Sequence, residues 1–411
     1  FKAGLSTTMC TAVLLETAWY YSQRNSNVFC CLLDASKAFD RVHFGRLFNL
    51  LERRQLPAPV IRLLFDSYSR HTVSALWDSA RSHPFSTKNG VKQGGVLSPI
   101  LFIVYFDELL ISLKDAGVGC YLGPNFVGGL GYADDITLVA PSLTALHEML
   151  NTCKSFADEY NVLFNAKKTV CIKFGEPHVD SETVSFLGQK LKWSNSVRHL
   201  GTIINSALTD SDDIDCKISQ FYGYCNKLKG NYGKLYGPVM VKLFNSFCCS
   251  FYSSQLWRLS SRGFANVGTQ WNKAVRCLLN LPYQTHTRLL GPLLGTHHIR
   301  VQLECRFLRF LQQLNNSDNE LVRFLGHRAV FCGRSLLGHN WNSLKLNYNF
   351  TSFDFLICKK RLISENMPDE VDISSILIAL DLFEILNDDS IILENFHREE
   401  IIDMFHFLCT N

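Results

Sequence analysis

The chain has 411 residues, of which 47% are hydrophobic and 19% charged, and its formal net charge is +4. This length is too great for one compact core, so we expect two or three domains. The apolar content is ordinary for a globular protein, and no segment is long and apolar enough to span a bilayer. The composition therefore excludes membranes from the expected partners.

The charge is unevenly distributed along the chain. Residues 351–411 carry a net charge of −9, so residues 1–350 carry +13. A basic body suits a polyanionic partner, because contacts from Lys and Arg to phosphate supply most sequence-independent affinity for nucleic acid. Solubility alone would also account for such a charge, so the motifs must decide between the two.

The fifteen cysteines fall mostly in apolar runs and never at Cys-x-x-Cys spacing. This pattern predicts thiols that serve as small hydrophobic side chains in a reducing compartment. The start of the chain lacks the pattern of a signal peptide. We therefore expect an intracellular protein of the nucleus and cytoplasm, not a secreted one.

Taken in chain order, helical and strand patterns alternate up to about residue 174. Residues 1–22 are predicted to become helical after a cap at Ser6 or Thr7, and further helices are predicted over residues 43–54, 60–68, 100–113 and 143–160. Strands are predicted over residues 28–33, 71–77 and 81–85, and the segment 162–174 is expected to lead into another strand. A glycine-rich loop at residues 90–95 would let the backbone approach a ligand closely. From residue 212 to about 311 helical patterns dominate, with Tyr and Lys interleaved as in a nucleic-acid-binding face or an ordinary amphipathic helix.

Two adjacent carboxylates, Asp134 and Asp135, lie between small residues and an apolar, β-branched run within residues 131–140. The pattern predicts a hairpin with both acids at its turn. Adjacent acids repel each other unless a cation lies on them. Mg²⁺ is the usual cation, because it binds carboxylate and phosphate oxygens. An isolated Asp-Asp pair is more often a solvated turn, so a second site must decide.

The second site is Asp34, which ends the apolar run of residues 28–33. A carboxylate at the end of a buried strand needs a partner, and a metal ion shared with Asp134 would be one. Three acids from one strand and one hairpin can hold two divalent ions about 3.5–4 Å apart for in-line phosphoryl transfer. These residues therefore predict a two-metal site.

Three segments carry a resemblance to a known family. Residues 33–40 (LDASKAFD), 90–99 (GVKQGGVLSP) and 132–135 (YADD) resemble consecutive motifs of reverse transcriptases. Their amino-acid sequences, order and spacing most resemble the motifs of non-LTR (LINE-type) retrotransposons of the CR1/jockey-like kind. The resemblance covers residues 1–205 and extends weakly to about 310. Because Phe1 falls inside a family motif, we expect a fragment that lacks upstream fingers and an upstream endonuclease domain.

The resemblance implies an α+β fold with a right-hand polymerase palm, which is an antiparallel sheet backed by helices. It implies partial fingers and palm in residues 1–205, an α-helical thumb-like region in 206–311, and an acidic helical region of unknown role in 312–411. The implied activity is RNA-directed DNA polymerase, a nucleotidyltransferase. Its implied partners are an RNA template, a DNA primer, dNTPs and two Mg²⁺ ions, for which Mn²⁺ can substitute.

The resemblance also implies roles for single residues. Asp34, Asp134 and Asp135 would hold the metal ions, and Lys168 would protonate or neutralise the leaving pyrophosphate. Phe39 would be a steric gate against the 2′-hydroxyl of ribonucleotides. The implied nucleotide contacts are Lys2, Ala35, Phe39 and Gln93, and the implied primer or template contacts are Gly94, Gly95, Leu200 and Gly201. Simpler roles stay open: a surface lysine for Lys168, a hydrophobic anchor for Phe39 and an exposed terminus for Lys2.

Two other interpretations of the whole chain stay open. One is an inactive relic that binds nucleic acid, because missing fingers could abolish nucleotide binding even with all three acids intact. The other is a group II intron-type reverse transcriptase, which also has a Tyr-Ala-Asp-Asp hairpin, although a maturase segment is not apparent in this sequence.

Overall fold

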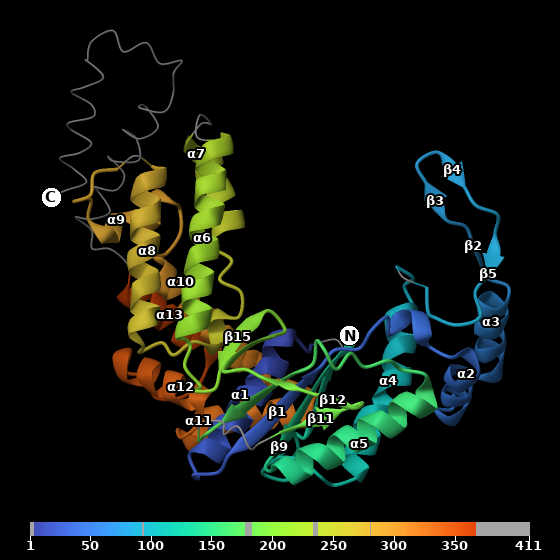
Figure 1. Ribbon diagram of the computed structural model, residues 1–411. Coiled ribbons are helices and arrows are strands. Elements are labelled where there is room, and N and C mark those ends of the chain that lie inside the picture. Colours follow the sequence, from blue (N-terminus) through green and yellow to red (C-terminus); the bar gives the residue numbers. More distant parts are fainter. Residues whose placement is uncertain (1–3, 93, 177–182, 233–236, 280, 367–411) are drawn as a thin grey trace. The chain divides into compact units, whose positions relative to one another are not determined.

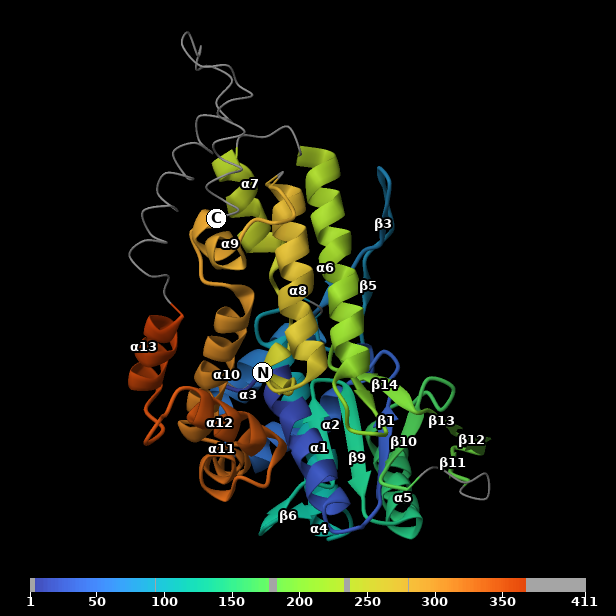
Figure 2. The ribbon, with the colours of Figure 1, turned by 90° about the vertical axis from the view of Figure 1, so that its left-hand side faces the viewer.

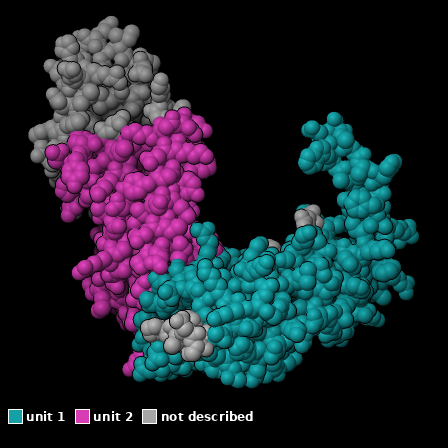
Figure 3. All heavy atoms as spheres, in the orientation of Figure 1, with its two compact units in different colours: residues 1–200, 205–208 teal, residues 201–204, 209–411 magenta. Residues whose placement is uncertain are grey.

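The computed structural model describes residues 4–92, 94–176, 183–232, 237–279 and 281–366 (Figure 1). The chain forms two compact units, coloured separately in Figure 3. Unit 1 comprises residues 1–200 and 205–208, and unit 2 comprises residues 201–204 and 209–411. Each unit is described by itself below.

The centre of unit 1 is a five-stranded sheet with the strand order β13-β10-β1-β9-β8. Its strands are β1 (Val28–Leu33), β8 (Gly129–Tyr132), β9 (Asp135–Ala140), β10 (Val170–Phe174) and β13 (Lys192–Trp193). The pairs β1–β9, β1–β10 and β8–β9 are antiparallel, and only β10–β13 is parallel. Strand β1 lies in the middle and is apolar on both faces, as a doubly covered strand must be.

Helices cover this sheet on both sides (Figure 1). On one face β1 and β9 share a hydrophobic core with α2 (Phe44–Arg53), α4 (Ser98–Asp115) and α5 (Leu143–Tyr160). Helix α1 (Thr7–Ser22), capped by the Ser6 hydroxyl, packs against β1 and β8 and lies on the other side. The predicted α+β class, with an antiparallel sheet backed by helices, is confirmed.

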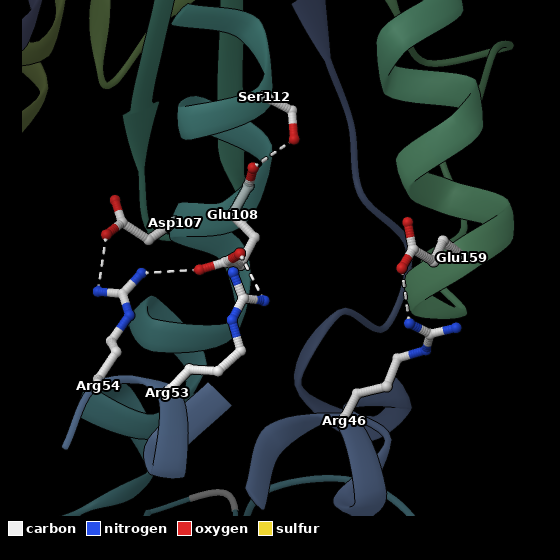
Figure 4. A network of polar contacts seen from close by, with 7 residues as sticks. All are labelled: Arg46, Arg53, Arg54, Asp107, Glu108, Ser112 and Glu159. Atoms are coloured by element: carbon white, nitrogen blue, oxygen red, sulfur yellow. Dashed lines mark hydrogen bonds and ion pairs between the residues drawn. The ribbon is translucent and has the colours of Figure 1, made fainter. Parts of the chain in front are cut away.

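Ion pairs join α2 to α4 and α5 (Figure 4). Arg54 contacts Asp107 and Glu108, each at 3.1 Å, and Arg46 contacts Glu159 at 2.8 Å. Exposed pairs of this kind contribute little free energy. Their effect is to orient α2 on the two longer helices, whose apolar faces supply the stability.

Short two-stranded elements complete unit 1. They are β2 (Thr72–Val73) with β5 (Phe85–Ser86), β3 (Leu76–Trp77) with β4 (Ala80–Arg81), β6 (Tyr121–Leu122) with β7 (Asn125–Phe126), and β11 (Ser185–Phe186) with β12 (Gln189–Lys190). The hairpin expected at residues 71–85 is present, but its two long strands were wrong. Each strand is split in two, because residues 82–84 lie opposite only residues 74–75 between the two paired segments, and Pro84 has no amide to donate. The hairpin follows α3 (Ala58–Ser69).

Unit 2 is helical, as predicted for residues 212–311, and α6 and α8 lie side by side in it (Figure 2). Its helices are α6 (Ser211–Tyr232), α7 (Gly237–Leu243), α8 (Arg262–Leu278), α9 (Thr287–Leu293), α10 (Ile299–Asn315), α11 (Glu320–Cys332), α12 (Leu336–Asn347) and α13 (Phe355–Glu365). Helix α10 is central and packs on α8, α11 and α13. The boundary expected at residue 311 falls inside α10, and a separate role for residues 312–411 stays a prediction.

The buried carboxylate of Asp213 ties the start of α6 to the rest of unit 2. It accepts hydrogen bonds from the Ile203 amide at 2.9 Å and from the Trp257 indole Nε1 at 2.8 Å. Residues 367–411 of the expected acidic helical region lie outside the described residues. None of the helices in the described part of the chain is long and apolar enough to cross a membrane.

The aromatic core of unit 1 gives a stability prediction. Phe102 on α4 is fully buried and stacks on Phe39 and Phe106, with ring centroids 4.2 and 4.9 Å apart. Phe102→Ala is expected to lower the free energy of unfolding by about 3–5 kcal/mol, because it leaves a cavity. Ile100→Ala, at a 56% exposed position of the same helix, should change it by less than about 0.5 kcal/mol. Urea denaturation of both variants measures the difference, and equal effects would contradict the packing described.

Candidate active site

Strand register brings two of the predicted acids together. Leu33 pairs with Ile136 across β1 and β9, so the next positions along the two strands are Asp34 and Asp135. Side chains alternate between the faces of a sheet, and Leu33 and Ile136 belong to the core shared with α4 and α5. Asp34 and Asp135 therefore project from the opposite face. Both line one cavity of about 420 Å³.

The electrostatics of Asp135 are set first by burial and then by the neighbouring acids. The pKa of Asp135 is raised by partial desolvation of its carboxyl, then by the charges of Asp134 and Asp34. Carboxylates at directly opposed positions of an antiparallel pair destabilise it unless a cation intervenes. The donor set, oxygen ligands alone, is the kind that Mg²⁺ and similar hard cations bind.

The third acid, Asp134, occupies the hairpin turn between β8 and β9. Ala133 before it has φ 54°, a left-handed conformation that a two-residue hairpin turn requires. Asp134 does not line the cavity that Asp34 and Asp135 share. Within the described ranges, no three His, Cys, Asp or Glu side chains are close enough to hold a metal ion as they stand. Asp34 and Asp135 supply the carboxylates of this cavity, and Mg²⁺ commonly combines one or two carboxylates with substrate phosphates.

A short loop fixes Asp34 at the end of β1. The Asn165 amide donates to the Asp34 carbonyl at 2.8 Å, and the Asp34 amide donates to the Thr169 hydroxyl at 3.4 Å. The Thr169 hydroxyl in turn donates to the Asn165 carbonyl at 2.9 Å, and Thr169 is fully buried. This loop also carries Lys168, whose Nζ lies 3.9 Å from Asp34 Oδ2. Lys168 is thus placed beside the acids, although 69% of its side chain is exposed.

The cavity contains cations that sequence reasoning missed. Besides Lys168, its wall includes Lys192, Arg198 and the hydroxyl-bearing Ser194 and Ser196. Lys192 reaches the site because β13 pairs parallel to β10, with Lys192 opposite Val170. Nothing local in the sequence signals such a pairing. Two carboxylates and three cations in one cavity could bind metal ions and phosphates together.

Comparison with known proteins identifies this domain. Residues 6–202 match the family described as "Reverse transcriptase (RNA-dependent DNA polymerase)". The chain is 26% identical over 312 residues to "RNA-directed DNA polymerase from mobile element jockey" of Drosophila funebris, covering 73% of this chain and 33% of that protein. It is 32% identical over 177 residues to "Retrovirus-related Pol polyprotein from type-1 retrotransposable element R2" of Popillia japonica, covering 41% and 24%.

Residues 6–202 form a reverse transcriptase domain of the non-LTR retrotransposon type. The predicted family is confirmed, and members of this family depend on divalent metal ions. The chain spans about a third of the jockey relative it matches. A solved structure of telomerase from Candida albicans, in complex with a TWJ fragment of telomeric RNA, has a TM-score of 0.41 and 13% identity over 91% of this chain and 52% of that chain. A likeness this weak supports no conclusion.

Of the four residues expected to contact the nucleotide, the structure describes Phe39 and Ala35. Phe39 opens a 3₁₀ turn, η1 (Phe39–Arg41), and its half-buried ring stacks on Phe102, which fixes its position. Ala35 is half-buried and forms an isolated antiparallel β-bridge with Phe164. Neither Phe39 nor Ala35 lines the carboxylate cavity. Lys2 and Gln93 lie outside the described residues, so their roles stay predictions.

The residues expected to contact primer and template lie in two turns. Gly94 is exposed with φ 80°, and a Cβ on Gly95 would lie 2.7 Å from the Ser98 hydroxyl at the start of α4. Leu200 and Gly201, with φ 46° and 86°, form the turn between β14 (Ser196–His199) and β15 (Thr202–Asn205). Both turns need backbone shapes that glycine adopts without strain, and their proposed contacts stay predictions.

The carboxylate pair predicts a pH effect. Because the folded protein raises the pKa of Asp135, its protonated form is favoured on folding, so the associated stability is present at low pH and is lost as the pH rises through that pKa. Asp34→Asn removes one neighbouring charge and should lower the pKa of Asp135. At pH 7 with EDTA, it should stabilise the protein by less than about 1 kcal/mol, since the site is open to solvent.

Carbon-13 NMR titration of the Asp135 carboxyl measures this pKa directly, and urea denaturation at pH 4 and pH 7 measures the stability. Asp158→Asn, at an exposed position of α5, is the matched control and should leave both unchanged. An Asp135 pKa that stays the same in Asp34→Asn would contradict the charge coupling.

Proposed function

We propose that this chain carries out RNA-directed DNA synthesis, joining a dNTP to the 3′-hydroxyl of a DNA primer on an RNA template. The observation that carries the proposal is the pairing of β1 with β9, which sets Asp34 beside Asp135 in a cavity that also contains Lys168. The membership of residues 6–202 in the reverse transcriptase family supports it. No observation favours a relic or a group II intron-type enzyme.

Asp34, Asp134 and Asp135 are the residues that would hold two divalent ions, Mg²⁺ or in its place Mn²⁺. Such ions, when bound, lower the pKa of the primer hydroxyl and neutralise charge on the phosphates. The protein's own contribution is to hold Asp34 at a fixed position: the loop of Asn165 and Thr169 anchors its backbone through two hydrogen bonds, and a third, from Thr169 to Asn165, braces the loop itself. Rigid placement of ligands is what such a site requires of its scaffold.

The cations of the cavity fit the phosphates of the substrates. Lys168, beside Asp34, is proposed to donate a proton to the leaving pyrophosphate or to neutralise it. Lys192 and Arg198 line the same cavity and are proposed to bind phosphates of the primer strand. Arg198 precedes in sequence the turn of Leu200 and Gly201, which is proposed to contact the primer. The glycine loop at residues 94–95 is proposed to approach the template.

Primer extension tests the proposal. The full chain, a DNA primer annealed to an RNA template, one dNTP and Mg²⁺ are expected to give single-nucleotide extension. Asp134→Ala should reduce the rate by more than about 100-fold. Losing a residue that only supports a metal ligand typically costs about 10–100-fold, and losing the ligand itself should cost more. The matched control Asp158→Ala removes an exposed acid of α5 and should retain the wild-type rate.

Each other outcome contradicts part of the proposal. Extension that survives Asp134→Ala would overturn the metal role of the hairpin. Absent extension with tight, salt-sensitive duplex binding would indicate the inactive nucleic-acid-binding alternative.

Phe39 is proposed as the steric gate that selects dNTPs over rNTPs. Its ring stacks face to face on that of Phe102, with the ring centroids 4.2 Å apart, so it would present a rigid surface beneath the sugar. Phe39→Val should improve the relative use of rNTPs by about 10–200-fold, the range for changing a few atoms of an apolar pocket. Phe39→Tyr keeps the ring and should keep the selection. Steady-state kcat/KM ratios for dNTP and rNTP measure this, and an unchanged ratio in Phe39→Val would make Phe39 a structural anchor only.

A further inference from the structure

The hairpin of residues 71–88, here called the arm, exposes several large apolar side chains of unit 1. Strands β2, β3, β4 and β5 build it, and Figure 3 shows it projecting from the rest of unit 1. No residue from 71 to 90 is buried. At its tip, Leu76 is 73% exposed and Trp77 is 84% exposed, directly before the two-residue turn of Asp78 and Ser79.

The arm lacks a core of its own. Val73 faces Phe85 across β2 and β5, yet the two side chains are 37% and 54% exposed. A lone two-stranded hairpin is at best marginally stable in water. Aromatic side chains at such exposure are a feature of binding surfaces. The tip is therefore expected to be covered by a partner when the protein functions.

The charge of the arm favours a polyanion as that partner. Arg81 and Lys88 have no hydrogen-bond or ion-pair partner for their side chains in the part of the chain that is described. Asp78 is the one acidic residue between 71 and 88. Arg81 pairs with Leu76 across β3 and β4, so a cation and an apolar side chain share a face at the tip, while Trp77 occupies the other.

The base of the arm is fixed to the proposed nucleotide site. The Gly90 amide donates to the Val42 carbonyl and the Val91 amide donates to the Phe39 carbonyl, both at 2.9 Å. Gly90 has φ 91°, and a Cβ there would lie 2.8 Å from the Asp40 carbonyl oxygen, so only glycine allows this approach. The segment that leaves the arm is thus attached to the turn that carries Phe39.

We propose that the arm binds single-stranded nucleic acid, namely the unpaired template strand ahead of the site of synthesis. Trp77 stacks on an unpaired base, and Arg81 and Lys88 contact the adjoining phosphates. Stacking on an exposed aromatic ring together with basic side chains is how single strands are bound without sequence preference. This inference rests on the proposed function, since it takes the single strand to be the template.

Binding to two duplexes tests the arm. Both are DNA primer–RNA template duplexes; one is blunt, and the other has an unpaired 5′ RNA overhang carrying 2-aminopurine. Fluorescence anisotropy without dNTPs measures affinity. Trp77→Ala in the full chain should weaken binding of the overhang duplex by about 5–150-fold, the value of one base–aromatic stack, and leave the blunt duplex unchanged. Trp77→Phe should restore most of the affinity and the quenching of 2-aminopurine.

Phe331→Ala is the matched control, because Phe331 on α11 is 83% exposed and distant in sequence from the arm. It should leave both affinities unchanged. Equal losses for the two duplexes, or no loss for either, would overturn the proposal. Self-association of the wild-type chain that Trp77→Ala abolishes, with unchanged RNA binding, would make the arm a protein-binding surface instead. Binding needs no catalysis, so failure of primer extension and failure of this inference are distinguishable.

Discussion

The candidate site of the reverse transcriptase domain depends on one constraint, the partial burial of Asp135 next to two other acids. Antiparallel pairing of β1 with β9 sets the two carboxylates opposite each other, and partial desolvation with two neighbouring acids raises the pKa of Asp135. A protein stabilises such an arrangement with a rigid frame or with cations. Here the frame is a sheet whose central strand is covered on both faces, and the nearest cation is Lys168.

The surrounding structure holds this pair without neutralising it. The loop of Asn165 and Thr169 bonds to the backbone of Asp34 and leaves its carboxylate open to the cavity. Lys168 stays 3.9 Å away and is largely exposed, which makes a weak ion pair. An acid pair held in place yet incompletely compensated is the electrostatic condition of a site that binds cations.

The fold connects this site to the surfaces around it through short backbone contacts. Gly90 packs against the Asp40 carbonyl, and two backbone hydrogen bonds attach the segment after the arm to the turn of Phe39. Phe102 then couples that turn to the core beneath the sheet. Substitutions in the core are therefore expected to change the selection between dNTPs and rNTPs by moving Phe39. Substitutions in the exposed arm are expected to leave the packing of the core unchanged.

The sequence by itself determined the three acids, the order of the motifs and most of the helices. Local chemistry is sufficient for these, because Ser6 and Ser142 cap their helices and the apolar run at 28–33 can only be a buried strand. The turn at Asp134 follows from the same local pattern. The sequence also predicted the hairpin at residues 71–85, although it did not predict the break in each of its strands.

Only the tertiary structure decided which residues share the site. Lys192 lines the same cavity as Asp34 because β13 pairs parallel to β10, and Thr169 supports Asp34 from 135 positions away. Phe39 is fixed by Phe102, on a helix that follows the arm. Such contacts join segments far apart in the chain, and their choice depends on how the whole sheet and its helices pack, which no local pattern of side chains encodes. The exposure of Trp77 is of the same kind, since burial is a property of the folded chain.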